Sequence, residues 1–339
     1  MEMKSQRLIR FFPPPDFLKM PSAGLSIETD CLRLVSFGKK QSHVVLNEAA
    51  EFVVEQGTIV NGEILKPNKL LVLLKKIRNE EGVRFARISL PEEKAYVYEA
   101  VIPMPEDGEI SDSVEFSLEQ NIPLAPAETV FDFAVVEGPF SNNNVPSVRV
   151  VVSAYPLATA ETLVDLLKQA GITPLAMTSE SQALARSLIL HGDTRPALLV
   201  HFLKEKTIIA IVSGGLVRFS TTVSRNLENS EKVLESHEGE KIVESVELLA
   251  VRDEVKKVYA YWMSKEGAKT SKDPKGIKSV IVTGYVADMV DISEYLGKHI
   301  GTPVFLGTVW RNALSLATQI PEIEFDDSLR FAIAAGVAL

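Results

Sequence analysis

The sequence predicts an α/β protein made of two related halves, with an α+β subdomain inserted into the first. The first observation is a β-hairpin pattern over residues 23–37, where apolar residues alternate on either side of a short polar turn. The second is a similar pattern over residues 197–219, where two apolar runs again flank a polar turn. The third is a change of pattern between Val83 and Ala170, where strands alternate with short helices. The repeated hairpin therefore indicates two halves, and the changed segment indicates the insertion.

A third strand and a helix complete the first half. Residues 38–41 turn the chain into a strand from His43 to Val54. Asn68 is predicted to cap the following helix, and Gly82 lies past its end. The apolar residues of this helix follow the spacing of one helical face: Leu70, Leu73, Leu74 and Ile77.

The inserted segment begins with two strands and then contains a helix. Asp112 and Glu115 suit a capping box for this helix, and Pro123 follows its end. A later helix is capped by Thr159 and stopped by Gly171. The strands predicted in this segment cover residues 84–90, 95–102, 130–136 and 148–152.

The second half repeats the order of three strands, with its third strand over residues 216–223. A long helix with Val255, Val258 and Trp262 follows a polar stretch. The loop over residues 264–276 carries four lysines, and we interpret it as solvated rather than bound to anionic lipid. The remaining elements are strands over 277–283 and 304–306, a helix over 292–300 and a final helix capped by Asp326 or Asp327.

These elements divide the chain into four parts. Residues 1–22 contain three consecutive prolines and are predicted to be an extension packed across the core. The first domain comprises residues 23–84 and 171–195, the insertion comprises residues 85–170, and the second domain comprises residues 196–339.

Composition limits the possible functions. The chain has 339 residues, of which 46% are hydrophobic, enough for two domains with ordinary cores. A net charge of -9 repels a phosphate backbone, so nucleic acid is excluded as a partner. The single cysteine, Cys31, rules out an intramolecular disulfide and favours the cytoplasm. No apolar run approaches the roughly eighteen residues that a membrane span needs, so we expect no direct membrane span.

Several segments resemble known families. The two hairpins resemble the paired phosphate-binding hairpins of the actin and sugar-kinase superfamily, whose nucleotide lies between the halves. Three further segments resemble the FtsA-related family of type IV pilus assembly proteins PilM: residues 115–124 with their Gln-x-Ile-Pro sequence, residues 170–184, and residues 331–339. The resemblance implies an actin-like (ribonuclease H-like) two-domain fold with an inserted α+β subdomain.

The resemblance also implies a nucleotide site, whose motifs this sequence has largely lost. Ser26 and Glu28 stand where the family's first hairpin has a metal-directed Asp and a phosphate-facing Gly. A Glu28 carboxylate about 4 Å from a phosphate would cost on the order of 4 kcal/mol at an effective dielectric near 20. His201 and Leu203 replace the corresponding Asp and Gly of the second hairpin, and Tyr285 replaces a glycine of the adenosine motif. The degenerate phosphate and adenosine positions are Ser26, Glu28, Thr29, Asp30, Arg33, His201, Leu203, Lys204, Thr283, Gly284 and Tyr285.

No other chemistry has its minimum set of residues. The motifs of nucleophile elbows, P-loops, dinucleotide sites and zinc peptidases are absent from the sequence, and the five histidines lack ligand spacing. We therefore predict no catalytic residue, no metal site and no cofactor. ATP with magnesium is the alternative that the resemblance leaves open, with Asp30 as its one acidic candidate.

The resemblance implies a non-enzymatic scaffold, a pseudo-ATPase, of a type IV pilus or a related secretion or competence complex. It would be cytoplasmic and held at the inner face of the membrane by a PilN-like bitopic protein, with other pilus ATPase or platform components as further partners. The two alternatives are an active actin-like ATPase in the same machine and a small-molecule kinase of the superfamily.

The PilN-like partner is expected to bind through its N-terminal cytoplasmic peptide. We predict a groove for this peptide between the inserted subdomain and the first half. Phe116, Gln120 and Ile122 are the candidate contacts, and the equally weighted alternative places Phe116 and Ile122 in the core.

Overall fold

The computed structural model describes residues 22–40, 43–105, 109–224, 234–235, 241–242, 246–267, 276–286, 292–315 and 317–339. The predicted N-terminal extension therefore lies almost wholly outside the described residues, as does most of the lysine-containing loop over 264–276. None of the described helices is long and apolar enough to cross a membrane.

The first half is a five-stranded mixed sheet with the order β10-β6-β1-β2-β3. Its first three strands follow one another along the chain, and each pairs antiparallel with the one before it: β1 (Ala23–Ile27), β2 (Cys31–Lys40) and β3 (His43–Val53). A short hairpin of β4 (Ile59–Val60) and β5 (Glu63–Ile64) precedes α2 (Pro67–Glu80). The strands β6 (Phe85–Leu90) and β10 (Thr173–Ser179) then add parallel to β1.

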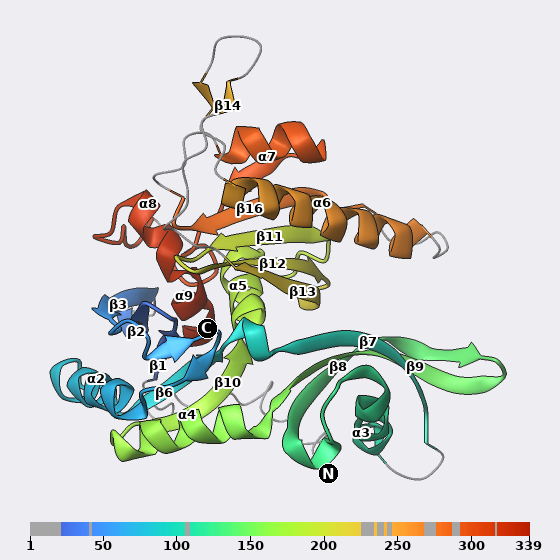
Figure 1. Cartoon of the computed structure of the whole chain (residues 1–339), viewed down its shortest axis with the longest axis horizontal. Helices are drawn as coiled ribbons and strands as arrows, with labels where there is room; N and C mark the ends of the chain where they lie inside the picture. The colour runs from blue at the N-terminus through green and yellow to red at the C-terminus, as the bar shows by residue number, and fades with distance from the viewer. Residues whose placement is uncertain are drawn as a thin grey trace.

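The second half repeats this topology in the order β13-β12-β11-β16-β17 (Figure 1). In both sheets the three antiparallel strands come first and two parallel strands complete the other side. This shared order confirms the predicted actin-like fold. The elements are β11 (Ala197–Phe202), β12 (Lys206–Ser213), β13 (Leu216–Ser224), β14 (Leu234–Glu235), β15 (Lys241–Ile242), α6 (Val246–Gly267), β16 (Ser279–Gly284), α7 (Ile292–Ile300), β17 (Val304–Leu306), α8 (Phe325–Ser328), η5 (Leu329–Phe331) and α9 (Ala332–Ala338).

The inserted subdomain is a three-stranded antiparallel sheet with a helix on one face (Figure 1). The strands are β7 (Tyr96–Pro103), β8 (Thr129–Asn142) and β9 (Val145–Pro156), with β9 in the middle. The helix is α3 (Ile110–Asn121), which buries Val114 and Leu118 against the sheet. Two 3-10 turns, η2 (Glu92–Lys94) and η3 (Pro126–Glu128), connect these elements.

The structure corrects the boundaries of the insertion. β6 pairs directly with β1 and so belongs to the first half, although the sequence placed it in the insertion. The helix α4 (Leu157–Gln169) also belongs to the first half, because Leu163 and Leu167 share a core with Leu70 and Leu74 of α2. The inserted subdomain therefore covers only residues 96–156, which leave and return at the same side of the first sheet.

Three predicted caps were also misplaced by a turn or less. Pro67 is the first residue of α2, because its missing N–H loses no bond there, so Asn68 lies inside the helix. Asp112 lies in the first turn of α3, and Thr159 lies inside α4. Gly171 does end α4, with a φ of +78° that suits glycine.

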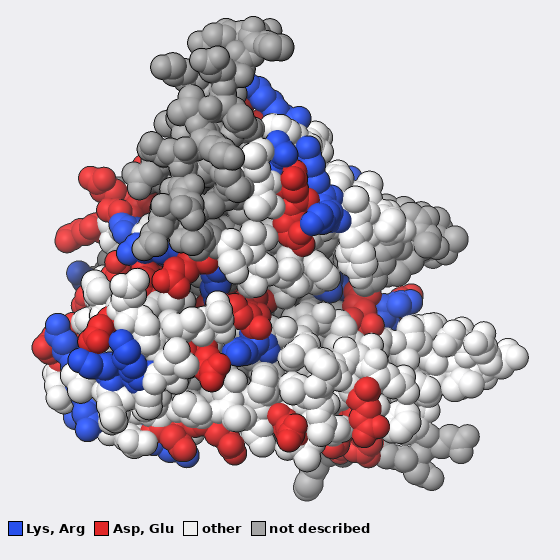
Figure 2. Space-filling model, viewed as in Figure 1, with Lys and Arg blue, Asp and Glu red and all other residues white. Residues whose placement is uncertain are grey.

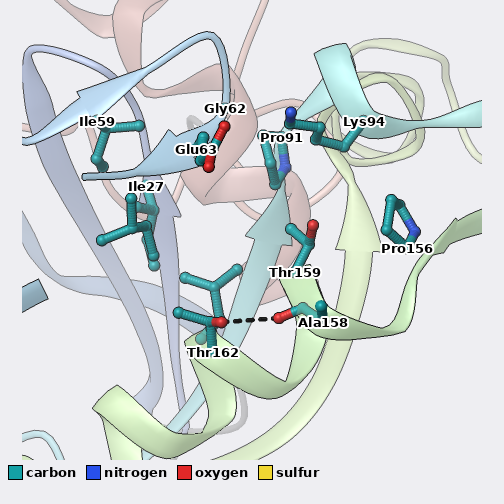
Figure 3. Close-up of a pocket in the computed structure, with 12 residues that line it drawn as sticks. Ile27, Ile59, Gly62, Glu63, Pro91, Lys94, Pro156, Ala158, Thr159 and Thr162 are labelled. Carbon is teal, nitrogen blue, oxygen red and sulfur yellow. Dashed lines mark hydrogen bonds between the residues drawn. The ribbon is translucent and has the colours of Figure 1, made fainter. Parts of the chain in front are cut away.

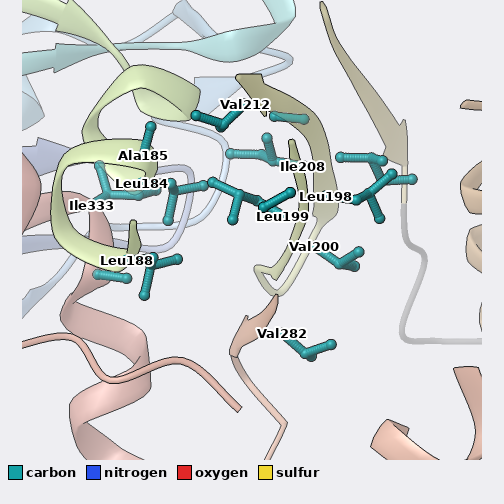
Figure 4. Close-up of a cluster of buried hydrophobic side chains, with 14 of the residues drawn as sticks. Leu184, Ala185, Leu188, Leu198, Leu199, Val200, Ile208, Val212, Val282 and Ile333 are labelled. Carbon is teal, nitrogen blue, oxygen red and sulfur yellow. The ribbon is translucent and has the colours of Figure 1, made fainter. Parts of the chain in front are cut away.

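Two helices fill the junction between the halves. α5 (Glu180–Leu188) and α9 pack against each other and against β11 and β12 in one apolar cluster (Figure 4). The contact is so close that a Cβ on Gly336 would lie 1.8 Å from the Ala183 carbonyl oxygen. On its other side α9 meets β1, where a Cβ on Gly24 would lie 2.2 Å from the Ala334 oxygen. The helix predicted to end the second domain therefore packs on the sheet of the first.

Candidate functional site

Acidic and basic side chains lie beside one another on the molecular surface (Figure 2). Lys69, for example, lies 2.9 Å from Glu55, and both side chains are more than half exposed. Exposed pairs of this kind contribute little to stability, because water screens them. Buried charged groups lie instead at the junction of the two halves.

Glu28 and Arg33 form a buried ion pair at the first hairpin. The side chains are 1% and 0% exposed, and the pair joins Arg33 Nη1 to Glu28 Oε2. Ser26 Oγ donates to the other carboxylate oxygen of Glu28 at 2.9 Å. Arg33 Nε donates to Glu51 Oε2 at 2.8 Å, because Glu51 stands opposite Arg33 in the β2–β3 register. Glu51 is not among the site residues predicted from the sequence. The antiparallel pairing of the second and third predicted strands would have placed it opposite Arg33.

Three polar contacts connect this network to the second half. Arg33 Nη2 donates to the hydroxyl of Tyr285 at 2.7 Å, and that hydroxyl donates to Asp30 Oδ2 at 3.3 Å. Lys204 Nζ lies 2.9 Å from the same Asp30 oxygen. We call Glu28, Asp30, Arg33, Lys204 and Tyr285 the junction cluster. It joins side chains from both hairpins and from the turn after β16.

The chain positions Tyr285 by a close backbone approach. Gly284 has a φ of +92°, and a Cβ there would lie 2.0 Å from the Phe202 oxygen, so only glycine fits. Tyr285 N donates to the same Phe202 oxygen at 2.8 Å. Burial raises the pKa of Tyr285 to about 12, against the lowering by the Arg33 charge, so the phenol keeps its proton and can donate to Asp30.

The remaining predicted positions lie around this cluster. His201 is fully buried and its Nδ1 lies 2.8 Å from Thr283 Oγ1. Burial, and then the charges of Arg33 and Lys206, lower the pKa of His201 to about 3, so its imidazole is neutral. Leu203 is buried, and Thr29 lies partly exposed in the bend between β1 and β2. The structure therefore brings the degenerate positions together, as two related hairpins require.

These residues do not fit ATP with magnesium. Within the described residues, Glu28, Asp30 and Cys31 are the one group whose ligand atoms all lie within 4.8 Å of one another. Arg33 and Lys204 already neutralise the two carboxylates. Burial raises the pKa of the Cys31 thiol, so it keeps its proton, and magnesium prefers oxygen ligands. The two carboxylates of this group are thus already paired with cations of the protein.

A pocket of about 330 Å³ lies within the first half, between β1, the β4–β5 hairpin and the start of α4 (Figure 3). Its apolar part is formed by Ile27, Ile59, Ile64 and Leu163, and Pro91 and Pro156 close one side. Polar groups of Glu63, Lys94, Thr159 and Thr162 surround this part. We call it the α4 groove.

None of the three predicted peptide contacts lines the α4 groove. Phe116 is 69% exposed on α3, and Gln120 is exposed on the same helix. Ile122 is 6% exposed and packs in the core of the inserted subdomain, which corrects its prediction as an accessible anchor. The sequence could not show the groove, because its walls come from four separate segments.

Comparisons with known proteins agree with this architecture. A family model described as type IV pilus assembly protein PilM matches residues 24–246. A solved PilM-PilN type IV pilus biogenesis complex superposes with a TM-score of 0.71 at 17% identity, covering 94% of this chain and 98% of the other. Ethanolamine utilization protein EutJ from Carboxydothermus hydrogenoformans is less similar, at a TM-score of 0.47 and 13% identity over 96% and 90% of the two chains. None of the curated proteins compared with the chain matches its sequence.

Replacing Arg33 by Met should lower the free energy of unfolding by about 3–5 kcal/mol, because Glu28 would remain buried without its cation. Urea unfolding measures this change. The double variant Arg33→Met with Glu28→Gln should lose less, since the one carboxylate still without its partner, Glu51, is 29% exposed to water. Arg149→Met, which removes the cation of a partly exposed pair with Glu137, is the control and should change the stability less. Equal losses in the Arg33 and Arg149 variants would contradict the prediction.

His201 should make stability depend on pH between about 6.5 and 3. In that window the unfolded chain protonates this imidazole while the folded chain keeps it neutral, so stability falls as pH falls. The slope is about 1.4 kcal/mol per pH unit for one proton. His201→Asn should reduce the measured slope by this amount, whereas His191→Asn, at an exposed position, should not. Urea unfolding at a series of pH values tests it, and an unchanged slope in His201→Asn would refute it.

Proposed function

The chain belongs to the family of type IV pilus assembly proteins PilM, and from this we propose that it is a non-enzymatic cytoplasmic scaffold of a pilus, secretion or competence complex. The observation that carries the proposal is the junction cluster. The buried Glu28–Arg33 pair and Tyr285, which bonds to Arg33, belong to the sequence positions that correspond by resemblance to the phosphate and adenosine motifs of the superfamily. The fold is kept and its nucleotide chemistry is lost.

Electrostatics supports the loss of ATP hydrolysis. A polyphosphate entering the junction would meet the carboxylates of Glu28 and Asp30, and it would have to take Arg33 and Lys204 away from them. Releasing Arg33 would leave Glu28 unpaired in a buried site, which costs several kcal/mol. Ser26 and His201 supply no carboxylate for a metal, so the ATPase and kinase alternatives lack their chemistry.

We infer that the scaffold binds the short cytoplasmic peptide of a PilN-like membrane protein, which would hold it at the inner face of the membrane. The structurally similar PilM is part of a complex with PilN. In this chain the α4 groove lies in the first half, and Pro156, at the end of the inserted subdomain, closes part of it. Its apolar floor suits one apolar anchor, and its polar rim suits main-chain contacts that set register.

The purified protein should neither hydrolyse ATP nor gain thermal stability from ATP with magnesium. A nucleotide at a hundred times its Kd would add about 2.7 kcal/mol of stability, so a missing shift is informative. Phosphate release and thermal unfolding with and without nucleotide measure both effects. A magnesium-dependent turnover that disappears in Asp30→Asn would establish the ATPase alternative instead.

Filling the α4 groove should abolish tight peptide binding. Thr162 lies exposed on α4 and lines the groove, so Thr162→Arg places a long cation over the apolar floor without disturbing the core. Losing one anchor of about 2 kcal/mol weakens binding roughly thirtyfold. The matched control is Gln169→Arg, an exposed residue two turns further along α4 that does not line the groove. Calorimetry with the N-terminal peptide of the PilN-like protein measures the affinity of both variants.

The same titration distinguishes the groove from α3. Phe116→Ala should leave peptide affinity within about twofold of the wild type, because Phe116 does not line the groove. If Phe116→Ala weakens binding and Thr162→Arg does not, the peptide site lies on α3 and the groove assignment is wrong.

A further inference from the structure

A second buried charge cluster links the two halves beside the α4 groove. Lys206, at the start of β12, lies with its Nζ 2.6 Å from Glu180 Oε2 and 2.5 Å from Glu93 Oε2. Glu180 is fully buried, and the Lys206 and Glu93 side chains are 9% and 18% exposed. The second half thus contacts both α5 and η2 through one ammonium group.

Backbone hydrogen bonds fix η2 to the beginning of α5. Glu92 N donates to Glu180 Oε2 at 2.9 Å, and Ser181 N donates to Glu92 Oε2 at 2.9 Å. The Glu92 carboxylate therefore satisfies an N–H at the start of α5, where a negative charge is favourable. This reciprocal pair holds η2 in one position, provided that the surrounding carboxylates are neutralised.

The segments that form this cluster also form the groove. Pro91 and Lys94 line the groove, while Glu92 and Glu93 between them face the cluster. The β9–α4 junction is arranged alike, with Pro156 in the groove wall and the preceding Tyr155 buried. The charges of Glu92 and Glu180 add to the effect of burial in raising the pKa of Tyr155, so this phenol lies near both.

We propose that Lys206 is a positioning residue for the α4 groove, which it shapes through η2 without touching the groove itself. The proposal rests on the proposed function and deepens it, because it makes peptide binding depend on the contact between the two halves. By linkage, a bound peptide would strengthen that contact by the same factor.

The mechanism follows from the charges. Without the Lys206 ammonium, Glu93 and Glu180 lose the cation that bridges them, and burial, which already raises the pKa of Glu180 to about 8, would leave the Glu180 carboxyl protonated. The Glu93 charge, unpaired in a mostly buried site, would then move η2, the shorter of the two elements that carry the three acidic groups. Pro91 would move with it, and Pro91 supports the β4–β5 hairpin so closely that a Cβ on Gly62 would lie 2.9 Å from its Cβ. Both walls of the groove would then shift.

The test compares peptide affinity in four variants, with the same PilN-like N-terminal peptide as probe. Lys206→Met should weaken binding roughly tenfold, a typical coupling, and Lys206→Arg should retain most of it. Lys204→Met is the matched control, since Lys204 bridges the same halves through Asp30 but does not contact η2, and it should stay within about twofold. Adding Glu93→Gln to Lys206→Met should restore part of the affinity, which a loss of general stability would not do.

A second measurement tests the role of Lys206 separately from the proposed peptide binding. Amide hydrogen exchange of residues 59–66 and 91–95, without peptide, should quicken in Lys206→Met and not in Lys204→Met. If Lys206→Met fails to fold, Glu93→Ala replaces it, because Lys206 then keeps Glu180, and a severalfold weaker affinity is expected. Unchanged exchange and unchanged affinity in a folded variant would overturn the coupling. A wild type that binds no peptide would instead overturn the proposed function, while the exchange result would still decide whether Lys206 shapes the groove.

Discussion

The buried ion pair between Glu28 and Arg33 is the constraint on which the junction of the two halves depends. A carboxylate and a guanidinium without solvent must satisfy nearly all of their hydrogen-bonding capacity inside the protein. Ser26 and Glu51 supply partners from the first sheet, and Tyr285 supplies one from the second half. The halves therefore come together because the charges of one require groups from the other.

Side chains of the chain itself span the junction of the two halves. Arg33, Lys204 and Arg330 all lie 5.3–5.5 Å from the centroid of the Tyr285 ring, so its phenol is surrounded by cations. Apolar packing of α5 and α9 also joins the two halves.

The sequence predicted strands and helices well, but it predicted poorly which distant elements pack against one another. The paired hairpins and the stripe of α2 were correct, because alternation and helical spacing depend only on neighbouring residues. β6 and α4 were assigned to the insertion although they pack in the first half, and the contact of α9 with β1 was not predicted, because the pattern of a segment does not state which sheet or helix it packs against. At the site, motif positions such as Ser26 and Tyr285 were found from the resemblance. Their partner Glu51 and the α4 groove required strand register and the meeting of distant segments.

The first half is discontinuous in sequence, since the helix that closes against β1 follows all the strands of the second half. During synthesis on a ribosome, the strands of the second sheet therefore emerge as one continuous stretch. The first sheet emerges earlier, but its contact with α9 can form only when the end of the chain has been made. Until α9 arrives, the face of β1 at Gly24 lacks its cover, and this exposed apolar surface is the kind that chaperones bind. The first half can thus complete its packing only after the second half has been synthesised.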